Sequence, residues 1–128
     1  MRRLHVSLLT ISLLCLACSS RPQFVSTQIG RTINTDGTVG DGTTVFAPDD
    51  TVYLSVATAG PGSATMRARW TYAGRLVDES TKRVSYRGDA ATEFHLKPPD
   101  PFPPGDYSVE IFFDGQSVGT TAFRVVER

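Results

Sequence analysis

Hydrophobic and polar side chains alternate with a period of two along most of the chain from Thr43 onward. The alternation is strict in the four segments TVYLSVAT, ATMRARWTYAG, DYSVEIFFDG and GTTAFRVVER. In the second segment Trp70 and Tyr72 point to one face, whereas Arg67 and Arg69 point to the other. Such alternation predicts antiparallel strands with one buried and one solvated face. Since no segment shows the period of an amphipathic helix, the pattern predicts an all-β protein.

Turn residues separate these segments. Asp114-Gly115, between two alternating runs, predicts a type I′ hairpin turn, because both central residues of that turn need positive φ. The segment LKPPDPFPPGD is expected to be a rigid loop, since proline cannot donate to a strand ladder. Residues 29–44, rich in Gly, Thr and Asp, are expected to form a frayed edge strand or a hairpin. Shorter strands are expected at residues 75–78, 83–87 and 92–97.

About seven to nine short strands in a chain of this size indicate an antiparallel β-sandwich. An alternating strand, a turn and a strand with the one tryptophan resemble the B and C strands of immunoglobulin-like (Ig-like) domains, and PPGDYSVEIFFDG resembles their F strand. The resemblance covers residues 43–128 and implies that Trp70 lies in the core and that Tyr107 is the equivalent of a tyrosine corner. Because the two cysteines are Cys15 and Cys18, the resemblance is to the cysteine-free, fibronectin-like version.

The first twenty residues differ in character from the rest. Met1-Arg2-Arg3 is basic, Leu4 to Leu16 is mostly apolar, and the chain becomes polar after Cys18. A basic start, a short apolar run and a small residue before a cut are typical of a secretory signal peptide. The apolar run is shorter than the roughly 20 residues that a bilayer-spanning helix needs. We therefore expect a signal peptide rather than a permanent transmembrane helix.

The segment Leu14-Cys15-Leu16-Ala17-Cys18 resembles the lipobox of bacterial lipoproteins. The resemblance implies cleavage between Ala17 and Cys18 and attachment of acyl chains at Cys18. The sequence departs from the family pattern at Cys15, where Leu, Val or Ile is usual. Ser19 resembles the residue that follows the cysteine in outer-membrane lipoproteins, since inner-membrane retention commonly uses Asp there. Ordinary secretion and a retained membrane anchor are the alternatives.

These features divide the chain into a signal peptide at 1–17, a lipidated cysteine with a flexible tether at 18–28, and an Ig-like domain at 29–128. Two of the thirteen basic residues and none of the thirteen acidic residues lie in the signal peptide, so the remaining chain is near neutral. A near-neutral domain argues against nucleic acid as a partner. Loss of Cys15 with the signal peptide leaves Cys18 alone, so no intrachain disulfide is expected.

Candidate catalytic and metal-binding residues are sparse beyond the signal peptide. His95 is the one histidine there, and in TEFHLK it is expected to face solvent between buried Phe94 and Leu96. No G-x-S-x-G motif accompanies it. One His and one acylated Cys cannot form a zinc site, and NTDGTVGDG does not meet the calcium-loop pattern. We therefore expect no catalytic residue, no metal and no cofactor.

Four residues are candidates for contact with a protein partner. If Trp70 faces the core, Arg67 and Arg69 stand side by side on the outer face of their strand. Neighbouring strands are expected to extend them into a basic patch suited to an acidic protein, a phosphate-bearing glycan or anionic lipid headgroups, with Arg75, Lys82, Arg83 and Arg87. The alternative is a solvated sheet face whose charges prevent edge pairing. Phe102, between prolines, is either an exposed contact on a rigid loop or a cap folded back on the end of the sandwich.

The sequence predicts a non-enzymatic lipoprotein whose lipid inserts in a membrane of the bacterial cell envelope. The domain is expected to face the periplasm from the outer membrane, as an accessory or assembly subunit that binds a protein of an envelope complex. The alternative is a periplasmic inhibitor or immunity-type protein that blocks an enzyme with its loops. A third interpretation, an enzyme with an unrecognised carboxylate or serine site, has no motif to support it. Fold alone does not decide among these, because unrelated functions share the sandwich.

Overall fold

The computed structural model describes residues 20–97 and 99–127. Ala17 and Cys18, the expected cleavage and lipidation positions, lie outside the described residues. The described chain forms eight strands and no helix: β1 (Gln23–Gly30), β2 (Val45–Phe46), β3 (Val52–Ala59), β4 (Gly62–Tyr72), β5 (Arg75–Tyr86), β6 (Ala90–Leu96), β7 (Gly105–Phe113) and β8 (Gln116–Val125). Accordingly, nothing in these residues is a helix long and apolar enough to cross a membrane.

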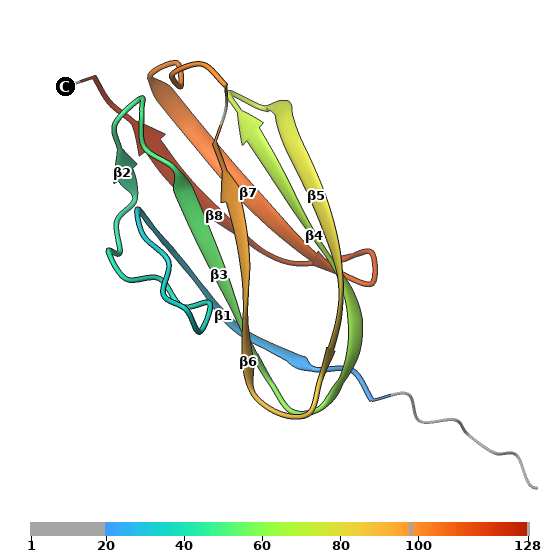
Figure 1. The fold of residues 1–128 in the computed structure, drawn as a ribbon. Helices are drawn as coiled ribbons and strands as arrows, with labels where there is room; N and C mark the ends of the chain where they lie inside the picture. The colour runs from blue at the N-terminus through green and yellow to red at the C-terminus, as the bar shows by residue number, and fades with distance from the viewer. Residues whose placement is uncertain (1–19, 98, 128) are drawn as a thin grey trace, which may run out of the picture.

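The strands form two sheets that pack face to face (Figure 1). One sheet has three strands in the order β1-β3-β6, and the other has five in the order β2-β8-β7-β4-β5. Neighbouring strands are antiparallel except for the short pair β2 and β8. The expected all-β, Ig-like antiparallel sandwich is therefore confirmed, and its strand number lies within the expected range.

Two tight turns connect neighbouring strands of the larger sheet. The predicted hairpin at Asp114-Gly115 is present, with φ values of 48° and 84°. Ala73-Gly74 joins β4 to β5 in the same way, with φ values of 46° and 81°. Positive φ at both central residues defines the type I′ turn, whose twist matches that of the flanking strands.

The structure corrects two of the expected boundaries. The flexible tether expected over residues 18–28 is wrong for residues 23–28, because β1 begins at Gln23 and pairs with β3 along its whole length. Its polar composition reflects an edge strand that is mostly exposed. The two short strands expected at 75–78 and 83–87 are one continuous strand, β5, which pairs with β4 from one end to the other.

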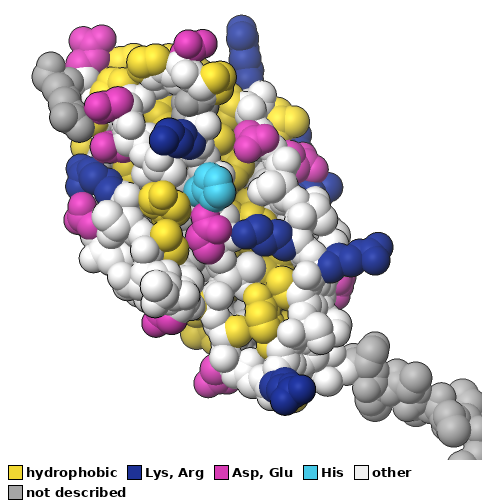
Figure 2. Space-filling model, in the orientation of Figure 1, with side chains coloured by type: hydrophobic (Ala, Val, Ile, Leu, Met, Phe, Trp, Pro, Cys, Tyr) yellow, Lys and Arg dark blue, Asp and Glu magenta, His cyan; other side chains and the backbone are white. Residues whose placement is uncertain are grey.

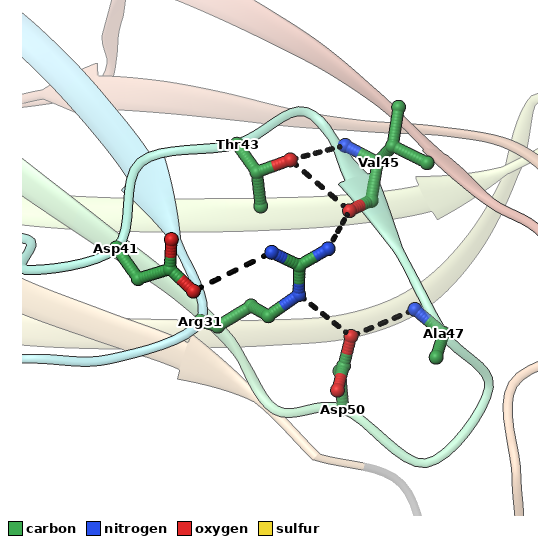
Figure 3. A network of polar contacts seen from close by, with 6 residues as sticks. All are labelled: Arg31, Asp41, Thr43, Val45, Ala47 and Asp50. Carbon is green, nitrogen blue, oxygen red and sulfur yellow. Dashed lines mark hydrogen bonds and ion pairs between the residues drawn. The ribbon is translucent and has the colours of Figure 1, made fainter.

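Arg31 holds the long connection between β1 and β3 in place through three hydrogen bonds (Figure 3). Its guanidinium donates to the carboxylates of Asp50 at 3.1 Å and Asp41 at 3.4 Å, and to the backbone carbonyl of Val45 at 2.8 Å. The expected hairpin is present here as an isolated bridge between Ile33 and Val39. Asp41 and Asp50 thus share Arg31 as their cation, and the connection places β2 beside β8.

Trp70 lies at the centre of the core with no exposed surface. Its ring meets Phe123 edge-on, with ring centroids 6.0 Å apart. The other side chains with no exposed surface come from both sheets: Phe46, Val52, Leu54, Val56, Met66 and Ala68. The residues that alternate inward along β3 and β4 therefore form the layer that joins the two sheets.

We expect Trp70→Ala to lower the free energy of unfolding by about 3–5 kcal/mol, because it leaves a large cavity between the sheets. Urea unfolding followed by circular dichroism measures this change. Arg69→Ala, an exposed neighbour on β4, is the control and should change stability by less than about 0.5 kcal/mol. A loss below about 1 kcal/mol for Trp70→Ala would contradict the central position of this ring.

Candidate functional site

An aromatic cleft opens between the sheets at the end of the sandwich that holds the β4–β5 turn and the β6–β7 loop. Its volume is about 370 Å³. The lining residues come from β4, β5, β6, β7 and the loop: Tyr72, Val77, Asp78, Leu96, Lys97, Pro99, Phe102, Pro103 and Tyr107. Hydrophobic side chains gather at this end of the molecule in Figure 2. A concave, mainly apolar surface with a few charged groups is the usual form of a binding site.

Two tyrosines on neighbouring strands hold the wall of the cleft. Tyr107 donates its hydroxyl to the carbonyl of Pro103 at 2.6 Å, and Tyr72 donates to the carbonyl of Pro104 at 3.0 Å. The two rings lie 4.6 Å apart. Gly105 has a φ of 142°, and a Cβ there would come within 2.9 Å of the Tyr72 ring. The loop therefore passes closely over the Tyr72 ring as it enters β7. The hydroxyl of Tyr107 bonds to the backbone a few residues upstream, as in a tyrosine corner.

Phe102 forms part of the cleft floor rather than an exposed contact. Its side chain is 4% exposed and meets Tyr107 edge-on at 5.7 Å. Its backbone N–H donates to the carbonyl of Pro48 at 2.8 Å, which ties the loop to the connection before β3. The interpretation of Phe102 as an exposed contact is therefore wrong. Its ring instead folds back and caps the end of the sandwich. Burial of the ring against Tyr107 is the physical reason.

The rim of the cleft carries opposite charges. Asp78, from β5, and Lys97, at the end of β6, are both exposed and come from different sheets. Beside Asp78, Val77 and Leu76 are 47% and 51% exposed, which is unusual for aliphatic side chains of this size. An apolar floor with charged groups at its border has the composition of a protein-binding surface.

Arg67 lies on the outer face of the larger sheet, as expected from its position, but it already has partners. Its guanidinium carbon lies 4.3 Å from the centre of the Phe112 ring. One of its terminal nitrogens lies 3.5 Å from a carboxylate oxygen of Glu79. These contacts hold the charge of Arg67 flat against the sheet.

Arg69 and Arg87 do not join Arg67 in a basic patch. Arg69 stands directly between Glu79 on β5 and Glu110 on β7 in the strand register. Arg67 faces Thr81, and Arg87 follows the end of β5, roughly 20 Å farther along at about 3.3 Å per residue. The outer face around Arg67 and Arg69 is therefore of mixed charge, which fits the alternative interpretation of a solvated sheet face.

His95 is exposed on β6, as expected, and its ring pairs with Glu93 on the same strand. Its Nδ1 lies 2.5 Å from one carboxylate oxygen of Glu93. The other carboxylate oxygen of Glu93 lies 3.5 Å from the amine of Lys82. Within residues 20–97 and 99–127, no three His, Cys, Asp or Glu residues gather closely enough to hold a metal ion.

The sequence did not point to the cleft as a site. Tyr72, Val77 and Leu96 looked like ordinary strand residues, and they meet only because three strands end at the same place. The proline-rich loop before Tyr107 was the one available signal. A second hollow, of about 530 Å³, lies at the opposite end beside Arg21 and Phe24, where the described chain begins.

No family model and no curated protein matches this chain. Among solved structures, it is similar to part of a novel β-glucosidase, EmGH1, from Erythrobacter marinus, with a TM-score of 0.57 and 12% sequence identity. The similarity covers 83% of this chain and 15% of the chain of that enzyme. At this level of identity the likeness shows the fold alone.

We expect the stability of the protein to fall in alkali because of Tyr107. Burial first, and Tyr72 second, raises the pKa of Tyr107 above its ordinary value. Above about pH 10 the unfolded chain therefore loses this proton before the folded protein does, so the free energy of unfolding falls as pH rises toward the folded pKa.

Tyr107→Phe tests this prediction by urea unfolding at neutral and at alkaline pH. At neutral pH the variant should be about 1 kcal/mol less stable, because the hydrogen bond to Pro103 is lost. Between about pH 8 and about pH 11 it should lose less of its remaining stability than the wild type. Tyr53→Phe, on the three-stranded sheet, is the control. An equal alkaline loss in wild type and Tyr107→Phe would contradict the role of Tyr107.

Proposed function

We propose that this chain is a lipoprotein of the bacterial cell envelope whose Ig-like domain binds a protein partner through the aromatic cleft and has no enzymatic activity. In this proposal the lipid is attached at Cys18 and inserts in the outer membrane, and the domain faces the periplasm as an accessory subunit of an envelope complex. The observation that carries the proposal is the position of the cleft, at the opposite end of the sandwich from Ser20.

The N-terminal end of the described chain is fixed to the end of the sandwich that holds the β3–β4 and β7–β8 turns. The backbone N–H of Ser63 donates to the carbonyl of Ser20 at 3.2 Å. Arg21 lies 3.3 Å from a carboxylate oxygen of Asp114. A hydrogen bond from the Thr65 N–H, and then Arg21, lowers the pKa of Asp114, so the carboxylate is available for this ion pair. These contacts hold Ser20 and Arg21 at this end of the sandwich.

The separation of the two ends supports the proposal. β4 runs from Gly62, beside Ser20, to Tyr72, in the cleft, and has 11 residues. At about 3.3 Å per residue, the two ends are therefore roughly 30 Å apart. A lipid attached two residues before Ser20 would leave the cleft unobstructed. Two or more acyl chains hold a protein at a membrane stably, whereas a single chain does not.

The chemistry of the cleft suits a protein partner better than a small polar substrate. Its floor is formed by Tyr72, Phe102, Tyr107 and prolines, which accept an apolar or aromatic side chain. Asp78 and Lys97 on opposite sides of the rim would set the direction of a bound segment. The wall is already ordered by the two tyrosine hydrogen bonds, so binding would cost little conformational entropy.

The same loop supports the second candidate function, an inhibitor or immunity-type protein that blocks an enzyme. Residues 99–104 lie at the end of the sandwich, exposed except for Phe102, and are stiffened by proline and by the hydrogen bonds from Tyr72 and Tyr107. A preformed loop of this kind inserts into an active site at low entropic cost. Tight one-to-one binding to a hydrolase would favour this function, and stable association with a structural envelope complex would favour the first.

We expect Cys18→Ser to abolish lipid attachment, because the thiol that carries the acyl group is removed. The measurement is labelled fatty-acid incorporation together with partition between detergent and water phases. The variant should accumulate as an unlabelled precursor. Cys15→Leu, which restores the usual lipobox residue, is the control and should remain labelled. Unchanged labelling of Cys18→Ser would refute the lipoprotein proposal.

We expect a photo-crosslinking amino acid at Val77 to capture the partner in intact cells, because Val77 lies on the exposed rim of the cleft. The matched control is the same amino acid at Val25, an exposed valine on β1 in the other sheet. The Val77 product should contain a different protein, so its mass should differ from that of a cross-linked dimer of this chain. Leu96→Asp in the cleft should reduce the amount of this product. Equal products from both positions would argue against the cleft as the binding site.

A further inference from the structure

β5 is the last strand of the larger sheet, and its outer edge is open. Within the described residues no strand lies beyond it in the order β2-β8-β7-β4-β5 (Figure 1). At 12 residues it is also the longest strand. An open, long edge strand presents a row of backbone N–H and C=O groups that can pair with another strand.

The sequence of β5 has a charge pattern that is complementary to itself. Two acids, Asp78 and Glu79, are followed by two small polar residues and then by two bases, Lys82 and Arg83. When such a segment meets a second copy running in the opposite direction, acids lie over bases at both ends. We propose that two copies of this chain pair antiparallel through β5, which joins two five-stranded sheets into one.

Symmetry restricts the possible registers of this pairing. In an antiparallel pair related by a two-fold axis, directly opposite residues have side chains on the same face. The axis must therefore pass between one residue and its own copy. With Thr81 at the axis, Glu79 lies opposite Arg83 of the second copy, and Asp78 lies diagonal to Lys82 of the second copy. Each of these contacts occurs twice, and opposite charges in such positions stabilise a sheet.

The other central positions are less favourable. An axis at Glu79 or at Lys82 would place two like charges directly opposite each other, which destabilises a strand pair. An axis at Ser80 would bring Val77 into the ladder. The register of β4 and β5 shifts there, since Trp70 pairs with Asp78 and Thr71 with Leu76. With Thr81 at the axis, the ladder covers residues 78–84 and stays clear of this bulge.

Glu79 and Arg83, the two charged side chains that lie directly opposite each other in this register, are accessible. Arg83 is exposed and takes part in no ion pair within the described residues. The side chain of Glu79 is 35% exposed beside Arg67, so a second guanidinium can approach its free side. Lys82 points to the other face, where it donates to the backbone carbonyl of Glu93 and lies 5.0 Å from the Phe94 ring centre. Arg83 would thus gain an ion-pair partner from the second copy, which is Glu79.

Charge reversal at the two opposing positions tests the proposal. Full-length chains with two different tags are co-expressed and co-purified in mild detergent. Wild-type copies should co-purify, whereas Glu79→Arg or Arg83→Glu present in both copies should reduce recovery by about tenfold, because like charges then oppose each other twice. One copy with Glu79→Arg and one with Arg83→Glu should recover wild-type association, since both opposing pairs are again complementary.

Two controls separate pairing from folding. Arg87→Glu makes the same charge change outside the ladder and should leave co-purification unchanged. Both reversals in one chain should restore association with itself, which also shows that the substituted strand still folds. Failure of wild-type copies to co-purify, or a mixed pair no better than either variant alone, would overturn the proposal.

The register is tested by disulfide trapping in full-length chains whose native cysteines are replaced by serine. Thr81→Cys should form a cross-linked dimer under mild oxidation, because residues opposite each other in a ladder have Cα separations that a disulfide can span. Thr120→Cys, an exposed threonine on β8, is the matched control and should remain mostly monomeric. Equal cross-linking at both positions, or trapping at Ser80→Cys without trapping at Thr81→Cys, would overturn this register.

Discussion

Aromatic packing between the sheets is the interaction on which the rest of the structure depends. The described residues contain no cysteine, so no disulfide among them joins the two sheets, and the sheets are held mainly by side-chain packing with a few hydrogen bonds such as that between Thr27 and Thr121. Phe123 occupies the middle, where it stacks on Tyr107 at 5.3 Å and meets Trp70 and Phe46 edge-on at 6.0 Å and 5.5 Å. Trp70 is held there although its indole nitrogen has no hydrogen-bond partner within the described residues.

The cleft and the open edge both follow from how this aromatic layer ends. Tyr107 extends the layer to Phe102, and the loop that carries Phe102 becomes one wall of the cleft. The bulge in β5 brings Val77 and Asp78 together on the opposite wall, and it also ends the regular ladder that the edge can offer. The two features therefore share Asp78, which lines the cleft and is the first residue of the proposed ladder. A partner in the cleft and a second copy at the edge would influence each other through this residue.

The parts of the fold that the sequence predicted are those in which one face is buried and the other is solvated. β3, β4, β7 and β8 alternate because each covers the core on one side, and the Asp114 turn follows from local backbone preferences. β1 and β5 were mispredicted because edge strands bury too little to alternate clearly. For the face with Arg67 and Arg69, the sequence left both a basic patch and a solvated, charged sheet face open. Alternation gives the face of Arg69 but not its cross-strand neighbours, and only the register places Glu79 and Glu110 beside it. The cleft could not be predicted at all, since its residues meet only in the folded chain.

The proposed dimer changes what a membrane anchor would do to the cleft. A two-fold axis between antiparallel β5 strands puts the N-terminal end of one copy beside the cleft end of the other. If both copies were anchored near Ser20, lipids at both ends would hold the joined sheet along the membrane, with each cleft close to the surface. A single anchored copy could instead stand upright and carry its cleft roughly 30 Å away, the length of β4 at about 3.3 Å per residue. Association through β5 would therefore determine how far from the membrane surface the cleft meets a partner. A partner that is itself attached to the membrane would fit the dimer, and one that reaches in from the periplasm would fit the single copy.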